Sequence, residues 1–127
     1  MAKIRTNVNF IGGRFISSDI PETFSSKRAF TLINFWASDL DDVTVVEKMP
    51  NVETISLSLN KISSLSFFKS CKNLKELFLR KNKICNLKEI HFLKNLPNLE
   101  VLWLWDNPFS SHPHYRLYIV KMLPKLK

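Results

Sequence analysis

The chain has 127 residues, a length typical of one domain, and 45% of them are apolar, which is ample for a core. Its net charge of +8 suits an acidic peptide or a nucleic acid as partner. No apolar run approaches the roughly 18 residues of a membrane span, and no apolar segment follows the charged first residues as a secretory signal requires. Two cysteines make no disulfide framework, so we expect free thiols and an intracellular setting.

The first 29 residues are expected to form an N-terminal lead and cap. Ser18 and Asp19 precede Pro21, a pattern typical of a helix start, and predict a short capping helix over 20–28. Residues 8–16, around the adjacent glycines, fit either a small hairpin or a disordered lead.

From residue 30 the chain repeats one pattern four times: apolar-x-x-apolar-x-apolar-x-x-Asn-x-apolar. The copies cover 30–51, 52–73, 74–98 and 99–112, so they begin 22, 22 and 25 residues apart. The apolar positions are Phe30, Ile33, Phe35, Leu40 and Val43 in the first copy, Val52, Ile55, Leu57, Ile62 and Leu65 in the second, Leu74, Leu77, Leu79, Ile84 and Leu87 in the third, and Leu99, Leu102, Leu104 and Phe109 in the fourth.

This pattern and its period are the signature of leucine-rich repeats. They predict the α/β class and a right-handed leucine-rich-repeat solenoid. A concave parallel sheet should face short helices or 3-10 turns on the convex side, with helical caps at the ends. Because one repeat cannot bury its own apolar face, repeats stack and leave an open surface for a partner. Strands are expected near 32–36, 54–58, 76–80 and 101–105. On the convex side, the short helices or turns should carry Phe68, Ile90 and Leu93.

An asparagine follows three of the four predicted strands, at Asn60, Asn82 and Asn107. We expect these side chains to turn inward as a structural ladder, because an amide can satisfy backbone groups that a sharp turn leaves unpaired. Ser38 takes this position in the first repeat and is the weak member of the ladder.

Residues 113–127 are predicted to be the C-terminal cap. Pro113 opens a segment whose apolar residues recur at helical spacing, which predicts a closing helix. Leu123-Pro124-Lys125-Leu126 then matches Leu96-Pro97-Asn98-Leu99 and opens a fifth copy, which we expect to be truncated.

Outward strand positions should form three columns across the repeats. Exposed aromatic patches tend to mark interaction sites, and Trp, Tyr and Arg supply most interface energy. The alternative is that the C-terminal cap or further chain covers Trp103 and Trp105, and residues 8–16 cover Trp36. The columns are Leu32, Thr54, Glu76 and Val101; Asn34, Ser56, Phe78 and Trp103; and Trp36, Ser58, Arg80 and Trp105. The candidate partner-binding residues are Trp36, Ser58, Phe78, Arg80, Lys81, Trp103 and Trp105.

Basic residues concentrate between Lys69 and Lys94, in the third repeat and its flanks. They could meet a nucleic-acid backbone, but most occupy turn or helix positions and fit a solvated convex face better. Arg80 and Lys81 are the exceptions, because they lie at the edge of the columns that contain the aromatic residues.

No pattern for catalysis, a metal or a cofactor is evident. His112 and His114 lack a third ligand nearby in sequence, and neither cysteine has an activating histidine. Asp39, Asp41 and Asp42 fit a solvated turn. We therefore expect a non-enzymatic protein without cofactor, metal, membrane or small-molecule substrate.

Several segments carry a family resemblance. The Asn-x-Ile repeats and the closing segment resemble leucine-rich repeats of the phosphatase-1 regulatory and spliceosomal A-prime types. A narrower resemblance is to the cilia- and flagella-associated leucine-rich-repeat proteins of basal bodies. It rests on Ile33–Ala37, Met49–Glu53, Ile55–Ser63, Glu76–Asn82 and Leu96–Leu104.

The narrower resemblance implies a non-enzymatic adaptor at the base of the cilium or flagellum, with a NIMA-related kinase tail as a partner. The other implies a ribonucleoprotein component, with a second protein on the repeats and RNA nearby. The residues by themselves indicate only a protein-binding solenoid.

Overall fold

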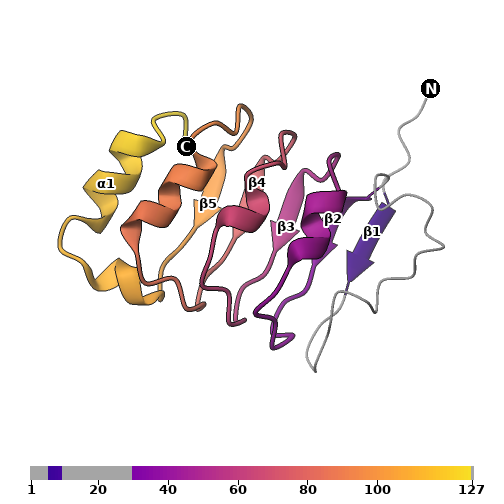
Figure 1. Ribbon diagram of the computed structural model, residues 1–127, viewed down its shortest axis with the longest axis horizontal. Coiled ribbons are helices and arrows are strands. Elements are labelled where there is room, and N and C mark those ends of the chain that lie inside the picture. The colour runs from indigo at the N-terminus through magenta and orange to yellow at the C-terminus, as the bar shows by residue number, and fades with distance from the viewer. Residues whose placement is uncertain (1–5, 10–29, 127) are drawn as a thin grey trace.

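The computed structural model describes residues 6–9 and 30–126, in which short strands alternate with 3-10 helices and one α-helix follows (Figure 1). The elements are β1 (Thr6–Asn9), β2 (Phe30–Asn34), η3 (Thr44–Lys48), β3 (Thr54–Ser56), η4 (Ser66–Phe68), β4 (Glu76–Phe78), η5 (Leu87–Leu93), β5 (Val101–Trp103), η6 (Pro108–Ser111) and α1 (Tyr115–Met122).

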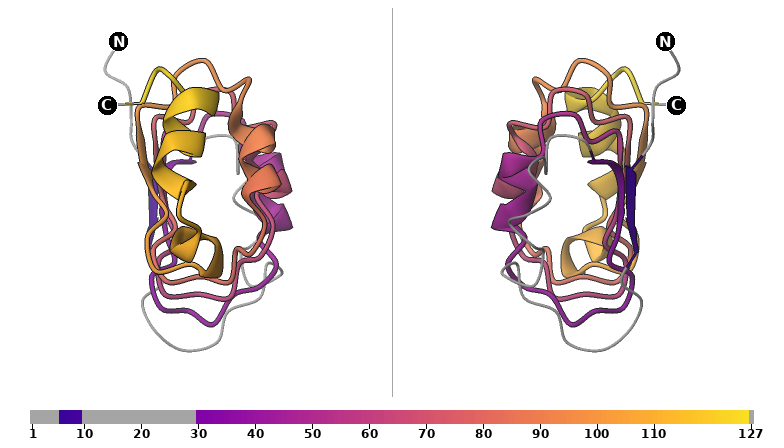
Figure 2. Two further views of the ribbon diagram at one scale, coloured as in Figure 1. Left: turned by 90° about the vertical axis from the view of Figure 1, so that its left-hand side faces the viewer. Right: turned by 90° about the vertical axis from the view of Figure 1, so that its right-hand side faces the viewer.

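The five strands form one parallel sheet in chain order, from β1 at one end to β5 at the other. The 3-10 helices η3, η4 and η5 lie on the opposite side of the molecule, as the end views in Figure 2 show. In the register, Ile33 pairs with Ile55, Ile55 with Leu77, and Leu77 with Leu102, which are the same position of successive repeats. The predicted leucine-rich-repeat solenoid is confirmed.

Strands β3, β4 and β5 are shorter than expected, and β2 is displaced by two residues toward the N-terminus, because regular pairing ends at residues 34, 56, 78 and 103. Backbone contact between repeats nevertheless continues past these ends. The N–H of Phe35 donates to the carbonyl of Ser56 at 2.9 Å, and the N–H of Ala37 donates to that of Ser58 at 3.0 Å. The columns of outward residues therefore extend two positions beyond the strands.

Strand β1 adds a fifth strand that the repeat pattern did not predict. It pairs parallel to β2, with Val8 opposite Ile33 and Asn9 opposite Asn34. The rest of the hairpin or disordered lead considered for 8–16, and the capping helix expected over 20–28, lie outside the described residues.

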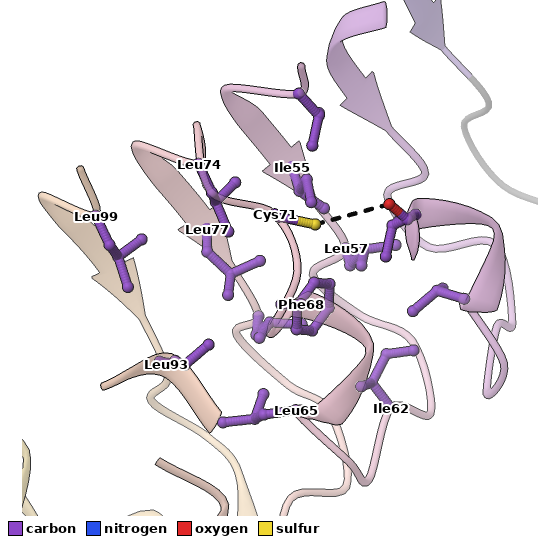
Figure 3. Packing of buried hydrophobic residues seen from close by; sticks show 14 of the residues in the cluster. Ile55, Leu57, Ile62, Leu65, Phe68, Cys71, Leu74, Leu77, Leu93 and Leu99 are labelled. Carbon is purple, nitrogen blue, oxygen red and sulfur yellow. Dashed lines mark hydrogen bonds between the residues drawn. The ribbon is translucent and has the colours of Figure 1, made fainter. Parts of the chain in front are cut away.

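The core lies between the sheet and the 3-10 helices. Ile55 and Leu77 are fully buried on neighbouring strands, and Phe68 of η4 is fully buried on the opposite wall (Figure 3). Ile90 and Leu93 of η5 are buried in the same way, as expected for the convex side. Full burial of such a side chain contributes roughly 1.5–3 kcal/mol, so each repeat is stabilised by its neighbours.

The asparagine ladder forms as predicted, with Asn60, Asn82 and Asn107 all buried. The Oδ1 atom of Asn60 accepts from the N–H of Leu40 at 2.8 Å, and its Nδ2 donates to the carbonyl of Phe35 at 2.9 Å. Each asparagine thus satisfies backbone groups of the preceding repeat, which would otherwise be buried without partners.

The residue before each ladder position adopts a left-handed conformation, although none of these residues is glycine. The φ angles are 53° at Ala37, 60° at Leu59, 55° at Lys81 and 60° at Asp106. Non-glycine residues are uncommon in this region, so the fourfold recurrence shows that the turn into the ladder imposes it.

The two cysteines behave differently. Cys71 is buried beside Phe68, and its Sγ lies 3.7 Å from the carbonyl oxygen of Val46 (Figure 3). Burial, with a smaller contribution from the charge of Glu47, raises the pKa of Cys71 to about 11. Cys85 is exposed, and neither cysteine is in a disulfide, so the expected free thiols are confirmed.

The closing helix is α1, and it covers the end of the solenoid next to β5 (Figure 1). Tyr115, Tyr118 and Ile119 pack against the core from one side of this helix. The Tyr118 hydroxyl is hydrogen-bonded to Nε2 of His91 in η5 at 2.9 Å. The described residues include no helix long and apolar enough to span a membrane.

Candidate functional site

The outward side chains of the sheet form the three columns that the sequence predicts. Strand pairing aligns Asn34, Ser56, Phe78 and Trp103 in one column and Leu32, Thr54, Glu76 and Val101 in the next. Backbone hydrogen bonds from Ala37 to Ser58, Leu59 to Arg80 and Lys81 to Trp105 align Trp36, Ser58, Arg80 and Trp105 as the third. We call the surface made by these columns the sheet face.

Three aromatic side chains form a continuous cluster on the sheet face. The ring centroids of Phe78 and Trp103 lie 4.6 Å apart at 67°, and those of Trp103 and Trp105 lie 4.9 Å apart at 37°. We call these three residues the aromatic cluster. Trp103 and Trp105 remain 43% and 42% exposed, so α1 does not cover them. Large exposed aromatic groups in contact with one another are typical of an interaction surface.

The third column is less uniform than expected. Trp36, at the far end of this column, is 42% exposed, but Ser58 is only 5% exposed. This contradicts the expectation that the Ser58 side chain is available on the sheet face. The reason is size, because the small serine lies in its column between the much larger Trp36 and Arg80. Ser58 therefore separates Trp36 from the aromatic cluster and offers little contact area of its own.

Positive charge borders the aromatic cluster on one side. Arg80 is half-buried next to Trp105 in the third column, and Lys81 follows it as an exposed residue of the left-handed turn. The N–H of Lys81 donates to the carbonyl of Trp105 at 3.1 Å, which fixes this turn beside the cluster. An arginine next to exposed indoles can bind a carboxylate while the rings take up apolar groups.

The column of Leu32, Thr54, Glu76 and Val101 has a different character, because its two central residues are polar and bonded to each other. The Thr54 hydroxyl donates to a carboxylate oxygen of Glu76 at 3.0 Å. Lys75 forms an ion pair with Glu53 at 2.9 Å near the start of these strands. The aromatic cluster and Arg80 thus belong to the other two columns of the sheet face, which lie nearer the turns.

Sequence reasoning missed a shallow polar hollow at the turn edge, beside Lys81. It has a volume of about 430 Å³, and Lys61 and Asp39 on its wall form an ion pair at 2.6 Å. The feature of the sequence that could have indicated this hollow is the presence of charged residues on either side of the ladder asparagines. Its other lining residues include Lys83 and Asp106.

Four of the remaining basic residues lie apart from this site. Lys69, Lys72, Lys88 and Lys94 are exposed outside the sheet face. In the described ranges, no three histidine, cysteine or acidic side chains come together as a metal site would require.

Comparisons with known proteins agree with this architecture. The chain is 44% identical to cilia- and flagella-associated protein 410 of Mus musculus over 97 residues, which are 75% of this chain and 39% of that protein. It is 28% identical to U2 small nuclear ribonucleoprotein A' of Neurospora crassa over 97 residues, 75% of this chain and 38% of that protein. The chain thus spans well under half the length of these curated relatives.

The fold also matches a solved structure. The Drosophila melanogaster SNF/U2A' complex contains a chain with a TM-score of 0.72 and 24% identity, over 95% of this chain and 68% of that chain. The resemblance to cilia- and flagella-associated leucine-rich-repeat proteins is confirmed by the mouse relative. Because the leucine-rich repeat family profile matches residues 17–127, this chain belongs to the leucine-rich repeat family.

Proposed function

We propose that this chain is a non-enzymatic protein-binding adaptor whose sheet face holds a segment of a partner protein. The observation that carries the proposal is the aromatic cluster of Phe78, Trp103 and Trp105, in which Trp103 contacts both neighbours and the two tryptophans are exposed. Aromatic anchors of this kind commonly dominate binding energy at protein interfaces.

The partner segment is proposed to be acidic. Arg80 and Lys81 lie directly beside the aromatic cluster, and the chain as a whole carries a net charge of +8. A carboxylate on the partner can accept paired hydrogen bonds from the arginine while an apolar neighbour packs on the indoles. Trp36 lies at the far end of the same column and is a secondary contact.

The site of action is proposed to be the base of the cilium or flagellum, at the basal body. The mouse relative, named as cilia- and flagella-associated, supports this location. A NIMA-related kinase tail is the partner proposed from the family resemblance. A segment of such a tail that binds here should combine carboxylates with a bulky apolar residue.

A ribonucleoprotein role is the second candidate. It is favoured by the fold match to the Drosophila SNF/U2A' complex and by the Neurospora U2 small nuclear ribonucleoprotein A' relative. In this case the sheet face would hold a second protein, and nucleic acid would lie nearby.

Affinity capture from ciliated cells distinguishes the two roles. The wild-type chain should retain basal-body or kinase proteins, and Phe78→Ala should lose them while remaining folded, because Phe78 points away from the repeat core. Recovery of splicing proteins instead would favour the second role. Equal recovery by the wild type and Phe78→Ala would contradict binding at the sheet face.

A further inference from the structure

An apolar hollow lies at the end of the solenoid, away from the sheet face. It has a volume of about 420 Å³, within the range of pockets that accept ligands. The buried side chains of Leu93, Leu96 and Leu99 line it on one side, and Leu123 and Leu126 line it on the other. We call this feature the end hollow.

The end hollow opens between two copies of the same short motif, Leu96-Pro97-Asn98-Leu99 and Leu123-Pro124-Lys125-Leu126. In the preceding repeats, an asparagine of this motif joins each copy to the one before it. The Nδ2 of Asn73 donates to the carbonyl of Pro50 at 3.0 Å, and that of Asn98 donates to the carbonyl of Lys72 at 3.3 Å.

This connection stops at the last copy, because Lys125 occupies the position of the asparagine. Within the described part of the chain, the Lys125 side chain makes no hydrogen bond to the preceding copy, and it is exposed on the rim. The two copies are therefore not joined as the earlier ones are. The hollow opens where the repeat-to-repeat link is missing.

The charge around the end hollow has one sign. Lys94 and Lys125 lie on its rim, and none of the described residues that line it carries a carboxylate. Apolar walls call for a bulky apolar side chain, and a rim of lysines favours carboxylates beside that side chain. A second copy of this chain is a poor match, since each copy carries a net charge of +8.

We propose that the end hollow is a second docking site, for an acidic segment of a partner protein that inserts a bulky apolar side chain between Leu96 and Leu123. This site is separate from the aromatic cluster, so an adaptor of this kind can hold two segments at once. Two weak contacts on one partner would then reinforce each other through their linkage.

The test uses the whole chain and a synthetic peptide in which leucines alternate with short runs of glutamate. Backbone amide NMR shifts should map binding to residues 93–99 and 122–126. Replacing the leucines with alanine, or the glutamates with lysine, should weaken binding at least about tenfold.

Charge-reversal variants provide the matched comparison. Lys94→Glu combined with Lys125→Glu should weaken the peptide at least about tenfold. Lys121→Glu is the control, because Lys121 is exposed on α1 and does not line the hollow. It should bind as the wild type does.

Four results would overturn the inference: no shifts at millimolar peptide, shifts confined to Trp103 and Trp105, equal binding by the double variant, or concentration-dependent self-association through residues 93–99 and 122–126. Shifts confined to the tryptophans would contradict the second docking site but not the proposed function of the sheet face. Loss of binding at the sheet face alone would contradict the proposed function but not the docking site at the end hollow.

Discussion

The side-chain oxygen of Asn60 accepts a hydrogen bond from the backbone N–H of Ser38, which lies 22 residues earlier, at 3.1 Å. This bond joins one of the three ladder asparagines to the weak member of the ladder, Ser38. The amide of Asn60 bonds the preceding repeat through both its oxygen and its nitrogen, whereas the Ser38 hydroxyl donates to the carbonyl of Trp36, within its own repeat, at 3.3 Å.

We therefore expect Asn82→Ala to destabilise the chain more than Ser38→Ala. The Oδ1 of Asn82 accepts from the N–H of Ile62 at 2.9 Å, and its Nδ2 donates to the carbonyl of Leu57 at 3.0 Å. Each buried group left without a partner costs roughly 1–3 kcal/mol, so Asn82→Ala should cost about 3 kcal/mol and Ser38→Ala about 1 kcal/mol. Denaturant unfolding measures both, and equal small shifts would contradict the ladder.

The left-handed backbone conformation of Lys81 leads to a second prediction. Glycine adopts positive φ without steric cost, so Lys81→Gly should leave stability unchanged or raise it by up to about 1 kcal/mol. Lys83 is the matched control, because it is an exposed lysine two residues away that lacks a positive φ. Lys83→Gly should lose about 0.5–1 kcal/mol of unfolding free energy. If thermal melts show the same loss for both variants, the turn at Lys81 is not strained.

Cys71 makes stability depend on pH in the alkaline range. Its pKa is raised from 9.0 to about 11 in the folded chain, so the unfolded chain releases the thiol proton first. The resulting stabilisation is complete below pH 9 and is lost as the pH rises toward 11, by roughly 1.4 kcal/mol per unit at most.

The measurement compares unfolding free energies of the wild type and Cys71→Ala between pH 8 and pH 11. The difference between them should shrink across this range. Cys85→Ala is the control, and its difference from the wild type should stay constant because Cys85 is exposed. A constant difference for Cys71→Ala would show that the thiol is not buried as described.

Lys125→Asn should restore the missing link at the end hollow. An added hydrogen bond between the last two motifs contributes about 1 kcal/mol, and it should also reduce binding of an apolar dye to the hollow. Lys125→Gln removes the same charge with a longer amide and serves as the control. If both variants melt alike and bind the dye alike, the asparagine link does not determine whether the hollow is open.

Most of the solenoid could be predicted from the sequence because repeat spacing fixes register. Once Ile33, Ile55 and Leu77 are assigned to one position, the columns of the sheet face follow without further assumptions. Strand β1 could not be found in this way. Thr6–Asn9 lacks the repeat pattern, and a short alternating segment does not reveal whether its partner is parallel or antiparallel.

The sheet face was less predictable than the core, because exposure depends on the size of neighbours. Ser58 occupies an outward position, yet the larger Trp36 and Arg80 leave it buried. Conversely, Trp103 and Trp105 stay exposed because α1 packs against the end of the core instead of the sheet face. A repeat register places side chains on a face, but it does not say which of them water reaches.

Whether a partner binds at the aromatic cluster and Arg80 is measured by the affinity of the captured partner for three variants at two salt concentrations. Phe78→Ala should weaken binding by about 2 kcal/mol through lost burial, and Arg80→Glu should slow association more at low salt than at high salt. Lys88→Glu, an exposed change on η5, should do little. If Lys88→Glu abolishes binding while Phe78→Ala and Arg80→Glu leave it intact, the basic convex side is the working surface and the account is wrong.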